Sequence, residues 1–175
     1  MFESGDNAGT GSIAKAHRVV STHDGLGIAE VGSVCLVIWQ AAVELQRFER
    51  QRSALQSVVG RYPRSAGFVC VVESSSAVPS QDYRRASIAM LTSHGEKLKC
   101  VIGVIEGSSF RTAATRSVLS GMVLLLPRQR FEFQISATVA AAAPILERCC
   151  ENVSTQSLVA AQRALCEGLA GSSAR

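Results

Sequence analysis

Apolar and polar residues follow one another in blocks whose lengths and periods suit strands and helices in turn. Three short runs are almost continuously apolar, which predicts strands buried on both faces: 33–40, 66–72 and 98–106. Residues 17–21 predict a short edge strand, and 27–31 pairs with the first buried run in a hairpin around Gly32 and Ser33. The run FEFQI at 131–135 alternates with period two, which predicts a more exposed strand near a sheet edge.

Longer amphipathic blocks lie between these runs and predict helices: 41–59, 81–98, 110–126, 137–150 and 154–169. Gly60 is expected to end the first helix, and Pro144 to disturb the fourth. In the helix 110–126, one stripe is expected to face inward: Phe110, Ala114, Val118, Gly121, Met122 and Leu125. Strands that alternate with helices predict an α/β protein with a single mixed, mostly parallel sheet and helices packed on it.

The 175 residues fit one domain with short extensions, and an apolar content of 47% supplies a sizeable core. Residues 1–15 lack periodicity and are expected to form a flexible tail. The formal net charge is +4, without a basic run or interleaved aromatics, so nucleic-acid binding is not expected. No segment has the character of a signal peptide or a membrane span, and the six cysteines lack a C-x-x-C motif. A cytoplasmic location is therefore expected.

Neither a catalytic centre nor a metal or cofactor site is expected. The glycines of AGTGSIAK and GLGIAEVG lack the spacing of phosphate-binding and dinucleotide-binding loops. The three histidines are scattered, and none follows His94, which excludes the usual hydrolase order of serine, acid and histidine. An enzyme of unrecognised chemistry is the least favoured of the three function classes considered.

Polar residues at the ends of the buried strands form the best candidate for a functional edge. Glu73 and Glu106 follow two parallel strands, at the carboxyl edge where α/β sheets place their ligand sites. Ser108 and Ser109 open the next helix, with Arg111 nearby, and could hold an anion on free backbone N–H groups. Alternatively, these acids only mark where a strand leaves the core, and the serines only cap a helix.

A serine-rich loop leads from the strand 66–72 into the helix that starts at residue 81. Its hydroxyls are candidate phosphorylation positions: Ser74, Ser75, Ser76 and Ser80. A phosphate there would carry roughly −1.5 to −2 charges at the positive end of a helix. Arg84 and Arg85, one turn further on, would attract it. The alternative is that Ser80 caps the helix and the other serines only solvate the loop.

Over about residues 26–150 the order of elements resembles the STAS family, the sulfate-transporter and anti-sigma-factor-antagonist domains, in its broader bacterial form. The segments that carry the resemblance are FVCVVESSSAVPSQDYRRAS and CVIGVIEGSSFRTAATRSVL. In that family, a partner kinase phosphorylates a serine in the loop D-S-[SG]-G, which switches partner binding. Here the loop reads Glu73-Ser74-Ser75-Ser76, so the Asp-Ser-Gly core is absent.

The resemblance implies a STAS-like domain over residues 16–150, a non-enzymatic signalling or regulatory module that binds protein partners. The alternative is a domain that binds a small anionic or lipid-like ligand near Ser108, Ser109 and Arg111. Residues 151–175 form an additional C-terminal helix beyond this architecture. Its stripe is expected to pack on the sheet of its own chain or on a second copy in a homodimer: Leu158, Ala161, Leu165 and Leu169.

Overall fold

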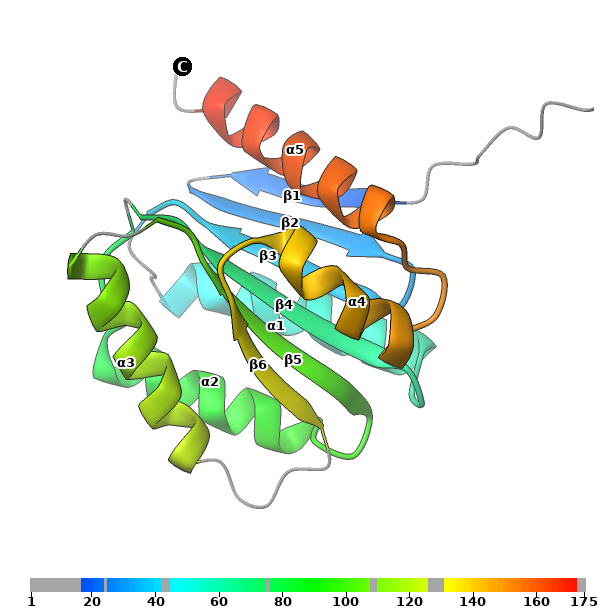
Figure 1. The fold of residues 1–175 in the computed structure, drawn as a ribbon, viewed down its shortest axis with the longest axis horizontal. Helices are drawn as coiled ribbons and strands as arrows, with labels where there is room; N and C mark the ends of the chain where they lie inside the picture. Colours follow the sequence, from blue (N-terminus) through cyan, green and yellow to red (C-terminus); the bar gives the residue numbers. More distant parts are fainter. Residues whose placement is uncertain are drawn as a thin grey trace, which may run out of the picture.

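A computed structural model describes residues 17–23, 25–41, 45–74, 76–107, 110–125 and 131–172. The predicted tail, residues 1–15, lies outside this part of the chain. Within the described residues, six strands form one sheet and five helices pack on it (Figure 1). The predicted α/β class with a mixed, mostly parallel sheet is confirmed.

The strands lie in the sheet in the order in which they occur along the chain. Their bounds are β1 (Arg18–His23), β2 (Leu26–Val31), β3 (Val34–Trp39), β4 (Ala66–Val72), β5 (Leu98–Ile105) and β6 (Glu132–Ser136). The pairs β1–β2 and β2–β3 are antiparallel, and β3 to β6 run parallel. The strands β1 and β6 therefore form the two edges, as the sequence pattern predicts.

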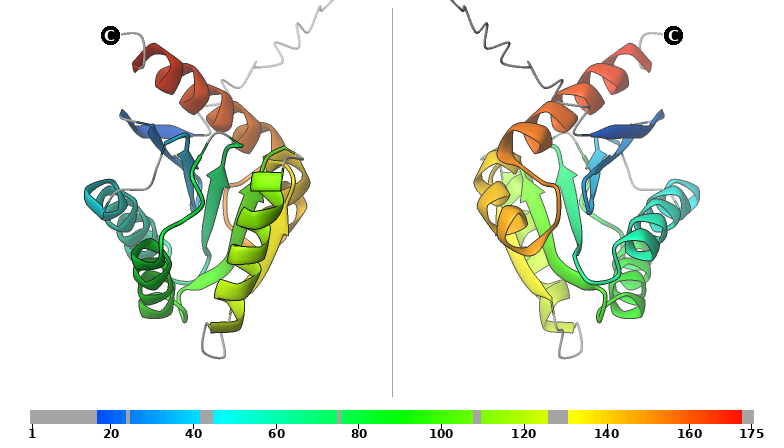
Figure 2. Two further views of the ribbon diagram at one scale, coloured as in Figure 1. Left: turned by 90° about the vertical axis from the view of Figure 1, so that its left-hand side faces the viewer. Right: turned by 90° about the vertical axis from the view of Figure 1, so that its right-hand side faces the viewer.

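The helices lie on both faces of the sheet (Figure 2). Their bounds are α1 (Leu45–Arg61), α2 (Gln81–Ser93), α3 (Phe110–Leu125), α4 (Val139–Cys149) and α5 (Thr155–Ser172). The crossovers α1, α2 and α3 connect successive parallel strands and share one face, since such crossovers have a single hand. The opposite face is covered by α4 and α5 (Figure 2).

The sheet separates two apolar layers. All six side chains of β3 are fully buried, because alternate residues enter alternate layers. Leu36 and Ile38 contact the layer below α4 and α5, whereas Val37 and Trp39 contact the layer below α1 and α2. This arrangement confirms the prediction that the continuously apolar runs are strands buried on both faces.

Three features of the helices differ from the sequence-based expectation. Gly60 lies inside α1, which ends at Arg61. The helix α2 ends at Ser93, five residues early, because the backbone turns at 94–97 with the Leu98 N–H bonded to the His94 carbonyl at 3.0 Å. The helix α4 continues through Pro144.

The hairpin turn between β2 and β3 is also a junction between distant segments. Gly32 has a φ of +53°, a conformation that glycine adopts without strain. The Ser33 N–H donates to the Glu151 carbonyl at 3.0 Å, and the Ser33 hydroxyl donates to the Ser65 carbonyl at 2.6 Å. The Glu151 N–H in turn donates to that hydroxyl at 2.8 Å. The turn therefore holds the link between α4 and α5 against the sheet.

The predicted apolar stripe of α5 is confirmed, and it packs on the sheet of its own chain. Its four members are between 0 and 1% exposed: Leu158, Ala161, Leu165 and Leu169. Gly27 of β2 lies so close to α5 that a Cβ atom there would sit 3.3 Å from the Leu165 Cβ. The stripe is therefore not free to cover a second copy, and a homodimer would need another surface.

Glu30 on β2 is a buried carboxylate that no sequence motif indicated. It is 5% exposed, and its Oε2 accepts from Arg18 at 2.8 Å and contacts Arg61 at 2.5 Å. Burial raises the pKa of this carboxyl, but the two guanidiniums outweigh that effect and hold it below its ordinary value. The three side chains connect the edge strand β1, the strand β2 and the end of α1.

We expect Glu30→Gln to lower the free energy of unfolding by about 1–3 kcal/mol near neutral pH, because two charge-assisted bonds are weakened. A depressed folded-state pKa contributes stability above the unfolded-state pKa of about 4.3. That contribution disappears as the pH falls through the folded-state pKa. Urea titrations at about pH 7 and about pH 3 should therefore show a smaller difference between Glu30→Gln and the wild type at the lower pH. Glu49→Gln, in an exposed pair with Arg52, is the control and should change little. A pH-independent difference would contradict this assignment.

Candidate functional site

The described serines of the loop between β4 and α2 lie in three different environments. Ser76 is 2% exposed, and its hydroxyl donates to the Trp39 carbonyl at 2.7 Å. A phosphate could not be added to Ser76 without breaking this bond and opening the loop. Ser80 caps α2 by accepting from the Tyr83 N–H at 3.2 Å, as the capping alternative predicts. Ser74 is exposed, and Ser75 lies outside the described residues.

The strand-end acids Glu73 and Glu106 lie at the ends of adjacent strands, as predicted. Both carboxylates accept hydrogen bonds from neighbouring side chains. Glu73 Oε1 accepts from the Gln40 amide at 2.8 Å and lies 4.0 Å from the Cys166 sulfur. Glu106 Oε1 accepts from the Gln162 amide at 2.7 Å. Gln162 and Cys166 lie one turn apart on α5. The two acids thus hold α5 on the sheet.

These contacts also define the state of the Cys166 thiol. Burial raises the pKa of Cys166, and the charges of Glu73 and Glu106 raise it further. The thiol is therefore protonated and unreactive near neutral pH. The carboxyl edge of β4 and β5 is, in consequence, a helix-docking surface in this structure.

The predicted anion edge at the start of α3 falls largely on residues that the structure does not describe. Ser108 and Ser109 lie outside the described residues, and only the backbone of Arg111 is described. Two side chains from the first two turns of α3 reach the end of β5. Arg116 donates to the Ile105 carbonyl at 3.2 Å, and Thr112 donates to the Glu106 carbonyl at 3.4 Å. Sequence reasoning missed both of these anchors.

Arg84 and Arg85 lie on α2, where they face α3 across an open groove of about 590 Å³. We call this surface the α2–α3 groove. It is lined by Gln81, Arg84, Arg85, Ile88, Ser117, Val118, Gly121 and Leu124. The predicted partner-binding residues therefore separate into two places, with the acids under α5 and these two arginines beside α3.

The α2–α3 groove combines exposed apolar surface with positive charge. Leu124 is 86% exposed, the highest value among the large apolar side chains that the structure describes. Neither Arg84 nor Arg85 forms an ion pair with a described residue, and the Arg84 Nε is buried without a hydrogen-bond partner. A buried guanidinium nitrogen without an acceptor is unusual, because such groups are normally paired.

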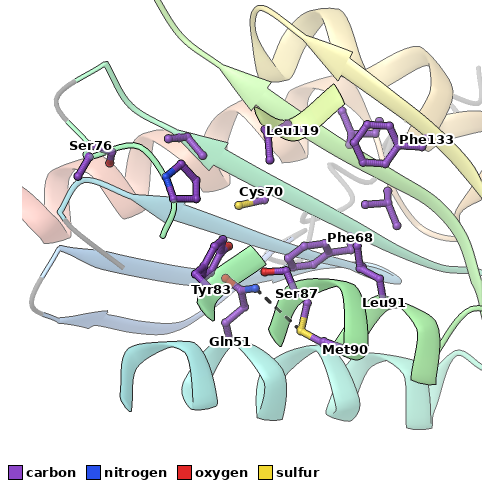
Figure 3. A pocket seen from close by; sticks show the side chains of 16 residues that line it. Gln51, Phe68, Cys70, Ser76, Tyr83, Ser87, Met90, Leu91, Leu119 and Phe133 are labelled. Carbon is purple, nitrogen blue, oxygen red and sulfur yellow. Dashed lines mark hydrogen bonds between the residues drawn. The ribbon is translucent and has the colours of Figure 1, made fainter. Parts of the chain in front are cut away.

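A second cavity, the inner pocket, lies on the other side of α2, between this helix and the sheet (Figure 3). It has a volume of about 50 Å³. Its walls come from β4, β5 and β6, from α1, α2 and α3, and from the loop 76–79. Figure 3 shows Gln51, Tyr83, Ser87 and Met90 on the helix side, opposite Cys70 and Phe68 of β4.

The polar groups of the inner pocket are few and uncharged. Gln51 Oε1 accepts from the Trp39 indole at 2.8 Å, its amide nitrogen lies 3.9 Å from the Met90 sulfur, and its side chain also interacts with the Tyr83 phenol. Ser87 is 5% exposed, and its hydroxyl, although it interacts with the Tyr83 phenol, forms no hydrogen bond of ordinary geometry with a described residue. Tyr83, Ser87 and Met90 recur at helical spacing in the sequence. Two polar residues on an inward stripe were a signal of this pocket that the sequence analysis did not use.

The described residues contain no cluster of three or more His, Cys, Asp or Glu side chains that could hold a metal ion. Among the same residues, no helix is long and apolar enough to cross a membrane.

No family model, curated protein or solved structure matches the chain. The resemblance to STAS domains therefore stays a prediction, and functional arguments depend on the surfaces described above.

Proposed function

We propose that the protein is a non-enzymatic regulatory module that binds an acidic segment of a partner protein in the α2–α3 groove. The observation that carries this proposal is the position of Arg84 and Arg85 beside the exposed Leu124, across a groove between two helices. The partner segment would be an amphipathic helix or an extended peptide with acidic and apolar side chains.

The apolar part of the groove suits such a segment. Ile88 of α2 and Val118 of α3 line the groove together with Leu124. A groove between two helices commonly accepts the apolar face of a partner helix, whose anchors recur every three or four residues. Apolar side chains in the groove would supply affinity, because they would cover surface that is now in contact with water.

The charge of the groove supports an acidic partner. The two helices that form it contain four arginines, at 84, 85, 111 and 116, and a single acid, Asp82. Among the described residues, no acidic side chain lines the groove itself. Carboxylates of a partner would complete the hydrogen bonding of the buried Arg84 Nε, and charge-assisted bonds of this kind add specificity.

A binding role is favoured over general acid–base catalysis by the engagement of Glu73 and Glu106 with neighbouring side chains. Within this proposal, Ser74 and Ser80 are the exposed positions for a regulatory phosphate. Ser80 opens the helix that carries Arg84, so a phosphate there would compete with an acidic partner for the same cation.

We expect peptides selected from a random displayed library on the intact protein to combine Asp or Glu with apolar residues at helical spacing. The double variant Arg84→Glu, Arg85→Glu should bind these peptides at least about tenfold more weakly, because it reverses the charge of the groove. Added salt should weaken binding to the wild type. Isothermal titration calorimetry measures both effects.

The matched control is the double variant Arg64→Glu, Arg163→Glu, in which both positions are exposed and distant from the groove lining. Each double variant lowers the formal net charge by four, from +4 to zero. Equal weakening by the two variants would mean that only net charge matters. Selection of peptides without acidic residues would also contradict the proposal.

A further inference from the structure

We propose that the inner pocket beneath α2 is a binding site for a small, uncharged and largely apolar molecule that carries one hydrogen-bonding group. This site is separate from the α2–α3 groove and does not depend on the function proposed for that groove. The inference rests on the neutrality of the pocket lining, on an unpaired buried hydroxyl, and on the size of the cavity.

The lining of the inner pocket excludes a charged ligand. None of its sixteen side chains is an Asp, Glu, Lys, Arg or His. Burial raises the pKa of the Cys70 thiol to about 12. Burial also raises the pKa of the Tyr83 phenol, against a smaller opposite effect of Ser87 and Gln51. Both groups are therefore neutral near pH 7, and an ionic ligand would be buried without a counter-charge, which is strongly unfavourable.

Ser87 supplies the polar group that would recognise the ligand. Its hydroxyl is buried and lines the cavity, and although it interacts with the Tyr83 phenol, it forms no hydrogen bond of ordinary length and angle with a described residue. Buried hydroxyls are normally paired, so an unpaired one that faces a cavity indicates a partner that enters from outside. The Gln51 amide nitrogen is a second donor that could bind the ligand, because the thioether sulfur of Met90 is only a weak acceptor.

The cavity sets the size of the buried part of the ligand. At about 50 Å³ it is smaller than a benzene-sized cavity of roughly 150 Å³, so it would hold a few heavy atoms. Gly103 on β5 leaves space in the cavity because it has no side chain. A Cβ atom there would lie 3.3 Å from the Leu119 Cδ1. The pocket is not fully enclosed, and the loop 76–79 forms part of its boundary.

A binding role and a structural role for Ser87 predict opposite effects of Ser87→Ala. If the hydroxyl is unpaired in the free protein, its removal eliminates a buried, unsatisfied group and should leave the melting temperature equal or higher. The same change should weaken a ligand that uses the hydroxyl by roughly five- to tenfold, the factor for one neutral hydrogen bond.

The test uses 1-butanol as the ligand and butanoate as its charged counterpart, with the methyl NMR signals of Met90, Leu91 and Leu119 as the readout. We expect butanol to shift these signals saturably, and butanoate at about pH 7 to leave them unchanged. Ser87→Ala should reduce the affinity for butanol without loss of melting temperature. Binding of acidic peptides to the groove is a separate measurement, so either proposal can fail alone.

Gly103→Ala is a second variant, which places a methyl group in the cavity and should also weaken butanol binding. Its matched control is Gly121→Ala, because a methyl group there meets no atom of the described residues within 4 Å. No shift up to the solubility limit of butanol would overturn the proposal. Equal affinity for butanoate, unchanged affinity in Ser87→Ala, or a loss of stability in that variant would also do so.

Discussion

Deletion of residues 152–175 is expected to yield a chain that unfolds and aggregates, because α5 forms part of the apolar core. The helix contributes four side chains that are fully or almost fully buried against β1, β2, β3 and α4. Without it, the apolar residues on one face of the antiparallel strands would be in contact with water. At roughly 25 cal/mol for each Å² exposed, uncovering a few hundred Å² of apolar surface would already offset the 5–15 kcal/mol by which domains are stable.

A point variant tests the same conclusion without truncation. Leu165→Ala is expected to lower the free energy of unfolding by about 2–5 kcal/mol, because it leaves a cavity where the side chain is 0% exposed. Arg163→Ala, exposed on the same helix, should stay within about 0.5 kcal/mol of the wild type. A truncated chain that keeps the parent's solubility and melting temperature would disprove the role of α5 in the core.

Gly32→Ala is expected to be the most destabilising single-methyl change, lowering the free energy of unfolding by at least about 3 kcal/mol. The backbone of Gly32 is left-handed, with φ at +53°. A Cβ atom there would also overlap the carbonyl oxygens of Glu151 and Asn152. Backbone atoms cannot move aside as a flexible side chain does, so the α4–α5 link would have to leave the turn.

Gly60→Ala is the control for this prediction, because a methyl group there meets no atom within 4 Å. It lies inside α1, where replacing glycine with alanine should stabilise the helix by up to about 1 kcal/mol. Chemical denaturation measures both variants. If Gly32→Ala behaves like Gly60→Ala, the turn is not in contact with residues 151 and 152.

The strands could be predicted from the sequence because each combines a strong apolar pattern with clear turn residues. The expected strand at 66–72 coincides with β4, and the hairpin turns at Gly32 and Ser33 as expected. Helix ends were harder to predict. Gly60 does not end α1, since an exposed glycine in the last turn is tolerated when the following backbone remains helical.

Only half of the expected inward face of α3 can be compared, because the side chains of Phe110, Met122 and Leu125 lie outside the described residues; among the described side chains of α3, the most buried are polar. Thr112 and Thr115 are each 3% exposed, while Ala114, Val118 and Gly121 are only half-buried. Hydrophobic periodicity cannot identify a stripe of threonines. The Thr112 hydroxyl bonds to the end of β5, a tertiary contact that no local pattern encodes.

In the candidate site, too, the positions of residues along the chain could be predicted, but their contacts with distant segments could not. The order of elements placed Glu73 and Glu106 at the ends of adjacent strands, and this prediction is confirmed. Their partners Gln162 and Cys166 come from a helix more than fifty residues later, so their engagement could not be foreseen. Likewise, the α2–α3 groove and the inner pocket exist only because α2 and α3 pack side by side.

The contact between β1 and α5 has a consequence for the synthesis of the protein on the ribosome. The Ser172 hydroxyl donates to the Thr22 carbonyl at 3.2 Å, across 150 residues, and Gly168 lies against the Thr22 side chain. Because translation proceeds from the N-terminus, the hairpin emerges long before the helix that covers it. One apolar face of the hairpin therefore stays uncovered in the nascent chain until α5 has left the exit tunnel.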